Sequence, residues 1–186
     1  MMRRGLMLCL FAACTMPGAS SLASDRDASL YQLHEKLLSQ DGKAIDLDLY
    51  RGKPELVTMF YASCPATCPL IIDTLRAVER KLDEPRRKQL HVLLVSIDPE
   101  RDTPAALRKL ADERHIDTSR WTLAHADAAA VRRIAAALSI QYRKLPYGQF
   151  SHSAIISSLT VDGKIMAQSA ELGHADPELL KVVNAP

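Results

Sequence analysis

Two cysteines in the first half of the chain are the residues best suited to chemistry. Cys64 and Cys68 lie in the stretch YASCPATCP, which runs from Tyr61 to Pro69 between an apolar run and an amphipathic segment. That order predicts a buried strand, a short loop and a helix. Sulfurs at the start of a helix face the positive end of its dipole, which favours the thiolate over the thiol. Thiolates are the form needed both for disulfide exchange and for binding soft metal ions.

The prolines in this stretch indicate where the helix begins. Pro69 suits the first helical position, because its missing N–H would have no partner inside the helix. Cys64 and Cys68 each precede a proline, and such residues are disfavoured in the α region. We therefore expect both cysteines in an extended loop that caps a helix running from Pro69 to about Leu82.

The spacing C-x-x-x-C allows two kinds of activity. Two thiolates and one imidazole would form a three-coordinate site that selects Cu(I), whereas zinc favours four ligands in a closed site. Cys64 and Cys68 could instead be a catalytic redox pair that reduces the disulfide of a partner. An inert local disulfide is a further reading, but a bridge closing so small a loop would stabilise the fold little.

A histidine is needed to complete the metal-site hypothesis. His125 ends a predicted strand, and His152 follows a loop containing proline and glycine. Both could face the cysteines, because sites in sheets of this kind collect at the ends of strands. The residues alone leave both candidates open. The chain has six histidines in all: His34, His91, His115, His125, His152 and His174.

Other residues near the expected site have simpler explanations. Asp98 follows the second predicted core strand, where a carboxylate could orient a ligand or influence a thiol. Asp98 and Asp102 also suit the turn and capping hydrogen bonds of a loop that enters a helix, and we favour that reading. Met59 and Met166 each lie in an apolar strand segment, so we expect core packing of both rather than thioether ligation.

The order of the predicted elements indicates the fold class. Strands alternating with helices, followed by a terminal hairpin and helix, predict an α/β protein with a mixed sheet and a parallel centre. The turn Asp41-Gly42 between two alternating runs predicts an N-terminal β-hairpin. A redox-type cysteine pair that opens the first helix is the thioredoxin-like layout. Besides the first helix we expect strands at 55–60, 91–97, 121–125, 153–160 and 164–169, a loop at 145–151, and helices at 105–114, 128–138 and 177–183.

The first 23 residues differ from the rest of the chain. Two arginines precede a short apolar stretch that includes Cys14, and small residues follow to Ala23. We read residues 1–23 as an export signal, either cleaved or lipidated at Cys14. The apolar part is well short of the roughly 20 residues that a spanning helix needs, so we expect no such helix. Residues 24–186 are then a single extracytoplasmic domain, periplasmic in a bacterium and membrane-attached if lipidated.

Charge and cysteine content exclude several classes of function. Without residues 1–23 the chain loses two arginines and keeps 22 basic against 22 acidic residues. This balance gives no electrostatic footprint for nucleic acid and none for an anionic membrane surface. Cys64 and Cys68 are then the only cysteines left, which excludes a disulfide-rich scaffold.

Three motifs together resemble the Sco/SenC family of copper-binding thioredoxin-like proteins. They are the segment 64–69 (CPATCP), the block 96–104 (SIDPERDTP), and Ser151-His152-Ser153 before an apolar strand and the turn 162–163. Their order and spacing also match, from about Leu33 to the C-terminus. One departure lies inside the first motif, where Ala66 stands at a position that is often acidic in the family.

The resemblance implies a fold, a ligand set and a partner. The fold is thioredoxin-like with an added N-terminal hairpin. The copper ligands are Cys64, Cys68 and His152, which decides against His125, and the bound ion is Cu(I), with Cu(II) as a further form. Family members deliver copper to the binuclear copper site of cytochrome c oxidase or reduce its thiols. The expected partner is therefore the copper-bearing oxidase subunit or another copper chaperone, and we expect a monomer.

Overall fold

The structure of the protein is a computed structural model that describes residues 28–184. The predicted export signal at 1–23 lies outside the described residues. Within them, no helix has the length and apolar character that crossing a bilayer requires.

Seven strands form one mixed sheet in the order β2-β1-β5-β4-β3-β8-β9. The central strands β3, β4 and β5 are parallel, and antiparallel neighbours flank them on both sides. Every residue of β3 and β4 is buried, as their continuous apolar sequences predict. The strands are β1 (Lys36–Ser39), β2 (Ala44–Asp46), β3 (Glu55–Phe60), β4 (His91–Ser96), β5 (Trp121–His125), β8 (Ile156–Leu159) and β9 (Ile165–Ser169).

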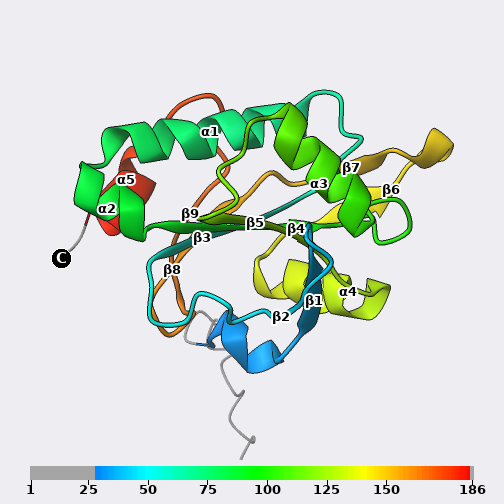
Figure 1. Cartoon of the computed structure of the whole chain (residues 1–186), viewed down its shortest axis with the longest axis horizontal. Coiled ribbons are helices and arrows are strands. Elements are labelled where there is room, and N and C mark those ends of the chain that lie inside the picture. Colours follow the sequence, from blue (N-terminus) through cyan, green and yellow to red (C-terminus); the bar gives the residue numbers. More distant parts are fainter. Residues whose placement is uncertain (1–27, 185–186) are drawn as a thin grey trace, which may run out of the picture.

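Helices cover both faces of this sheet (Figure 1). α1 and α3 lie on one face and α4 on the other, so the predicted α/β architecture is confirmed. The predicted N-terminal hairpin is also present, as β1 and β2, and it joins the sheet through β1 and β5. The helices are α1 (Thr67–Lys81), α2 (Glu84–Gln89), α3 (Pro104–Glu113), α4 (Ala128–Ala137) and α5 (Pro177–Val183), with 3-10 turns η1 (Leu30–Leu33) and η2 (Pro146–Gly148).

The helix α1 is fixed to the sheet by an apolar face and by one buried carboxylate. The Glu79 side chain accepts a hydrogen bond from the indole N–H of Trp121 at 3.0 Å and contacts the Arg120 guanidinium at 2.5 Å. Both partners lie at the start of β5, so the helix cannot shift along the sheet without breaking these bonds. The apolar face is fully buried and consists of Ile71, Ile72, Leu75 and Val78.

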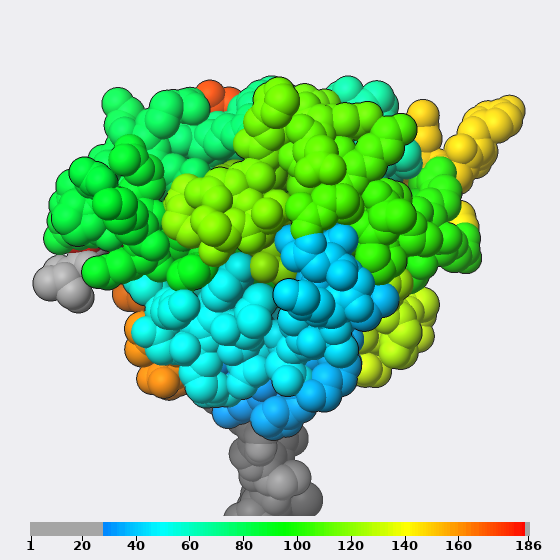
Figure 2. Space-filling view, in the orientation of Figure 1, coloured from blue at the N-terminus to red at the C-terminus, as the bar shows by residue number. Residues whose placement is uncertain are grey.

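A second, two-stranded sheet stands apart from the first. β6 (Tyr142–Lys144) pairs antiparallel with β7 (Phe150–His152), and η2 forms the tip between them. This hairpin projects from the body of the molecule (Figure 2, yellow). The loop predicted at 145–151 was therefore wrong in its last two residues, which belong to β7.

The structure also adds a helix where the sequence predicted only a helix end. The first helix was predicted to end at about Leu82, and the Asp83 side chain directly after it accepts a hydrogen bond from the Arg86 N–H at 2.9 Å. It thereby caps the short helix α2, with Pro85 in the first turn where its missing N–H costs nothing.

Candidate metal centre

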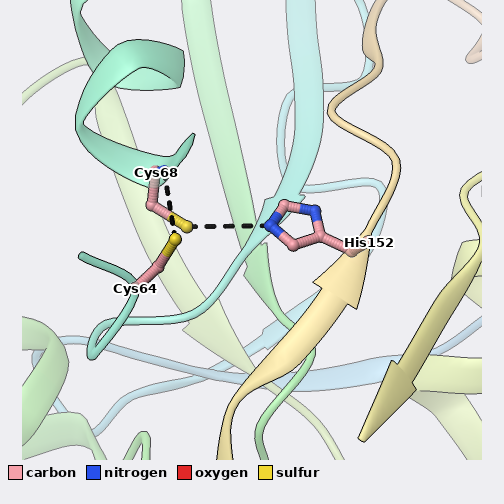
Figure 3. A group of neighbouring side chains, drawn as sticks. All are labelled: Cys64, Cys68 and His152. Atoms are coloured by element: carbon pink, nitrogen blue, oxygen red, sulfur yellow. Dashed lines mark hydrogen bonds between the residues drawn. The ribbon is translucent and has the colours of Figure 1, made fainter. Parts of the chain in front are cut away.

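The two cysteines lie on either side of the start of α1. The helix begins at Thr67, so Cys68 is helical and the expectation that Pro69 is its first residue was wrong. A proline is tolerated throughout the first helical turn, because none of the N–H groups there has a partner inside the helix. Cys64 remains in the preceding loop. The Cys68 N–H, unpaired within the helix, donates to the Cys64 sulfur at 3.3 Å (Figure 3).

The two thiols have opposite pKa shifts. Burial raises the pKa of Cys64, but hydrogen bonds from the N–H groups of Cys68 and Ala66 outweigh that effect and the net pKa is lowered. Cys68 is only 4% exposed, and burial holds its pKa well above the usual range. The expectation that the helix start favours both thiolates therefore fits Cys64 and was wrong for Cys68.

His152 approaches the cysteines from the end of β7. Its Nε2 lies 3.9 Å from the Cys68 sulfur, and its Nδ1 lies 3.2 Å from the Ser153 carbonyl oxygen. A carbonyl can only accept, so Nδ1 carries the proton and Nε2 presents its lone pair to the cysteines. Burial lowers the pKa of His152, which keeps the imidazole neutral at neutral pH.

One donor atom from each of Cys64, Cys68 and His152 lies within 4.8 Å of the other two (Figure 3). Two sulfurs and one neutral imidazole nitrogen form a soft donor set of the kind that suits Cu(I). Among residues 28–184 the group contains no fourth histidine, cysteine or carboxylate, as a closed zinc site would require. The donor set therefore fits copper in its monovalent form.

The alternative histidine lies elsewhere. His125 is the last residue of β5 and is paired with Leu38 of the N-terminal hairpin, outside the cysteine and histidine cluster. Met59 is fully buried, as expected. Met166 is 50% exposed, so the expectation of core packing was wrong there. It lies on the edge strand β9, where alternate side chains face solvent.

The loop after β4 holds the cysteine loop in place. The Asp102 carboxylate is buried and accepts hydrogen bonds from the Ala62 N–H at 2.9 Å and the Ser96 hydroxyl at 2.5 Å. Asp98 has the expected turn role: its carbonyl accepts from the Asp102 N–H and its carboxylate pairs with Arg101. The sequence suggested only local turn and capping bonds for Asp102. Its hydrogen bond with Ala62, 40 positions earlier in the chain, was not expected.

Tyr61 is a second residue that sequence reasoning missed. It is buried between the two halves of the site, with its N–H directed at the Cys68 sulfur at 3.4 Å. Its hydroxyl donates a hydrogen bond to the Phe150 carbonyl oxygen at 3.3 Å and accepts one from the Phe150 N–H at 3.4 Å. Its ring meets the His152 ring edge-on, with centroids 5.9 Å apart. An aromatic residue three positions before Cys64 was the only sequence signal for this role.

Comparison with known proteins places the chain in a family. The family model SCO1/SenC matches residues 24–184, nearly the whole chain. The chain belongs to the SCO1/SenC family. This agrees with the resemblance inferred from the three sequence motifs.

A curated relative of this SCO1/SenC protein carries a name that refers to copper. A Stutzerimonas stutzeri protein named as copper-binding is 32% identical over 119 residues, which cover 58% of this chain and 56% of that relative. The chain thus spans about half the length of that curated relative.

Solved structures support the fold. A SCO1/SenC family lipoprotein from Bacillus anthracis matches with a TM-score of 0.70 at 20% identity, covering 80% of this chain and 89% of that one. Arabidopsis thaliana ScoI with copper bound matches with a TM-score of 0.69 at 20% identity, covering 80% and 93%. At such identities the likeness establishes the thioredoxin-like fold alone.

Proposed function

We propose that this protein is an extracytoplasmic copper chaperone that binds Cu(I) through Cys64, Cys68 and His152. The copper is delivered to the copper-bearing subunit of cytochrome c oxidase, for assembly of its binuclear site. The observation that carries the proposal is the convergence of two sulfurs and a neutral imidazole nitrogen within 4.8 Å. Membership of the SCO1/SenC family supports both the metal and the acceptor.

Each ligand has a distinct part in this function. Cys64 is partly exposed and has a lowered pKa, so its thiolate is available to meet an incoming ion. Cys68 is buried with a raised pKa, and therefore releases a proton when copper binds. His152 supplies a neutral nitrogen held by the Ser153 carbonyl. Copper leaves by exchange, each ligand of the acceptor replacing one ligand here, with no change in oxidation state.

The unequal thiols favour a second candidate, thiol–disulfide reduction. The Cys64 thiolate would attack a disulfide of the partner, releasing one partner thiolate and forming a mixed disulfide. Cys68, after losing its proton, would then attack the Cys64 sulfur and release the second partner thiol. Two electrons pass to the partner, and Cys64 and Cys68 end as a disulfide. Both are free thiols in the structure, the state from which this reaction starts.

The location follows from the proposal. A chaperone for an oxidase copper site works outside the cytoplasm, so we infer that residues 1–23 export the domain formed by 24–186. Mass spectrometry of the protein purified from its host distinguishes cleavage after Ala23 from lipidation at Cys14.

A transfer experiment tests the proposed function. The purified protein is loaded anaerobically with one equivalent of Cu(I) and mixed with the apo, reduced copper-bearing domain of the oxidase. Copper should move to the acceptor, and a His152→Ala variant should bind and transfer little. In a parallel assay the acceptor is supplied with its cysteines oxidised. The second candidate would be established instead by two results together. The parent protein would transfer no copper, and the His152→Ala variant would reduce the oxidised acceptor at the parental rate.

A further inference from the structure

The hairpin that carries His152 ends in an aromatic side chain that the fold does not use. Tyr147 is 100% exposed at the tip and has a φ of +65°, in the left-handed region. Glycine or asparagine adopts that conformation with less strain, and a polar residue would suit full exposure better. Neither backbone conformation nor packing therefore explains a tyrosine at this position.

Each of the two segments that supply the donor atoms carries a large exposed apolar side chain. Leu70 follows Cys68 by two residues and is 46% exposed, while Tyr147 precedes His152 by five. Pro65 and Ala66, beside Cys64, are exposed as well. Figure 2 shows the hairpin projecting beyond the body on the side where α1 begins. The other large exposed apolar residues among 28–184 are Leu49, Val161 and Met166.

The tip is within reach of any protein that exchanges a metal ion with this site. Tyr147 lies five residues before His152, so their Cα atoms are at most about 17 Å apart, at about 3.3 Å per residue. A protein–protein interface covers about 800 Å² on each partner, a disc of about 16 Å radius. An interface of this size, about 32 Å across, therefore spans both His152 and Tyr147.

The tip is held in position by the loop after β4. The Arg101 guanidinium donates to the Gly148 carbonyl while it pairs with the Asp98 carboxylate. Lys144 forms an ion pair with Glu100 at 2.6 Å. An aromatic residue on a preorganised tip loses little entropy on binding, and such residues dominate the binding energy of interfaces.

We propose that Tyr147 and Leu70, with Pro65 and Ala66, form the docking surface for the protein that exchanges copper with this site. The inference rests on the proposed function and deepens it. The partner is a copper-binding protein with an apolar recess beside its own metal ligands, which receives the Tyr147 ring. We expect a carboxylate at the rim of the recess, because Arg143 of β6 is exposed and forms no salt bridge within residues 28–184.

Stopped-flow measurement of copper transfer tests this surface. Cu(I)-loaded parent, Tyr147→Ser and Leu70→Ser proteins are each mixed with the apo copper-bearing domain of the oxidase. We expect the second-order rate constant to fall at least tenfold for Tyr147→Ser and severalfold for Leu70→Ser. Cu(I) affinity should stay within twofold of the parent, because neither side chain touches a donor atom. Val161→Ser and Met166→Ser are matched controls and should transfer at the parental rate.

The outcomes separate this inference from the proposed function. A parent protein that transfers copper, with Tyr147→Ser transferring equally fast, overturns the docking surface and leaves the chaperone intact. A parent protein that transfers none overturns both. The surface could instead bind a second copy of this chain, and sedimentation of the metal-free parent tests that alternative. A parent dimer that the Tyr147→Ser substitution converts to a monomer would overturn the proposal.

Discussion

Cys64 and Cys68 lie four residues apart at one helix start, yet their pKa shifts have opposite signs. The helix dipole acts on both sulfurs in the same direction, and the depth at which each sulfur is buried cannot be read from the sequence. Burial decides the outcome for Cys68, and N–H donors decide it for Cys64. At the residue scale, therefore, the types of the ligands could be predicted from the sequence, whereas their protonation depends on surroundings that only the fold supplies.

Tyr61→Phe should weaken copper binding without removing a ligand. The variant keeps the ring that meets His152 but loses the hydroxyl that bonds the Phe150 main chain. A hydrogen bond of this kind contributes about 1 kcal/mol, so we expect roughly fivefold lower Cu(I) affinity. X-ray absorption of the Cu(I) protein should show a smaller share of nitrogen in the first coordination shell.

Tyr142→Phe is the matched control for that change. Tyr142 lies opposite His152 in the same hairpin, but its hydroxyl makes no hydrogen bond with residues 28–184. Equal losses of affinity in both variants would show that Tyr61 does not position the histidine.

At the scale of elements, the site depends on three segments that meet: the start of α1, the end of β7 and the loop after β4. The strands β3 and β4 could be predicted because their apolar runs are continuous. The start of α1 could not be placed to the residue, since a proline fits any position of the first turn. The strand β7 was missed because its three residues are too few for a clear period.

Asp102→Ala should loosen the cysteine loop and destabilise the fold. The change leaves the Ala62 N–H and the Ser96 hydroxyl without their acceptor. Loss of one buried hydrogen-bonding partner costs about 1–3 kcal/mol, and urea unfolding measures it directly. We also expect weaker Cu(I) binding. Asp112→Ala, which removes an exposed carboxylate of α3, serves as control, and an equal loss of stability in the two variants would contradict the role assigned to Asp102.

At the scale of the whole molecule, a buried acid makes stability depend on pH. Glu55 begins β3 and is 1% exposed, with one oxygen accepting from the Tyr31 hydroxyl at 2.7 Å and the other unpaired. Burial raises the pKa of Glu55 to about 8. Between the ordinary pKa of a glutamate and this value, the folded protein holds a proton that the unfolded chain has lost, so stability falls as pH rises.

Glu55→Gln should flatten this dependence. The free energy of unfolding of the parent should fall, relative to the variant, by up to about 1.4 kcal/mol per pH unit between about pH 4.5 and pH 8. Urea unfolding across that pH range measures the difference in free energy of unfolding between the two proteins. Contributions from titratable groups that both proteins share cancel in this difference. Parallel curves for the two proteins would show that Glu55 ionises in the folded state as it does in the unfolded chain.

The distance between the two halves of the site is the part that the sequence could not supply. Cys68 and His152 are 84 positions apart, and residue types alone left His125 equally eligible. Only the resemblance to a family favoured His152. The order of strands in the sheet explains why His152, and not His125, lies beside the cysteines. β3 leads into the cysteine loop and pairs with β8, the strand that follows β7, whereas β5 carries His125 toward the N-terminal hairpin.

The most direct test of the account is an anaerobic Cu(I) titration of the reduced protein and its Cys64→Ser, His152→Ala and His125→Ala variants, against a chelator of known affinity. We predict one tightly bound equivalent for the parent and for His125→Ala. Cys64→Ser and His152→Ala should each bind at least about tenfold more weakly, the smallest loss expected when even an outer contact of a metal site is removed. A His152→Ala protein that binds Cu(I) as tightly as the parent would contradict the three-ligand site.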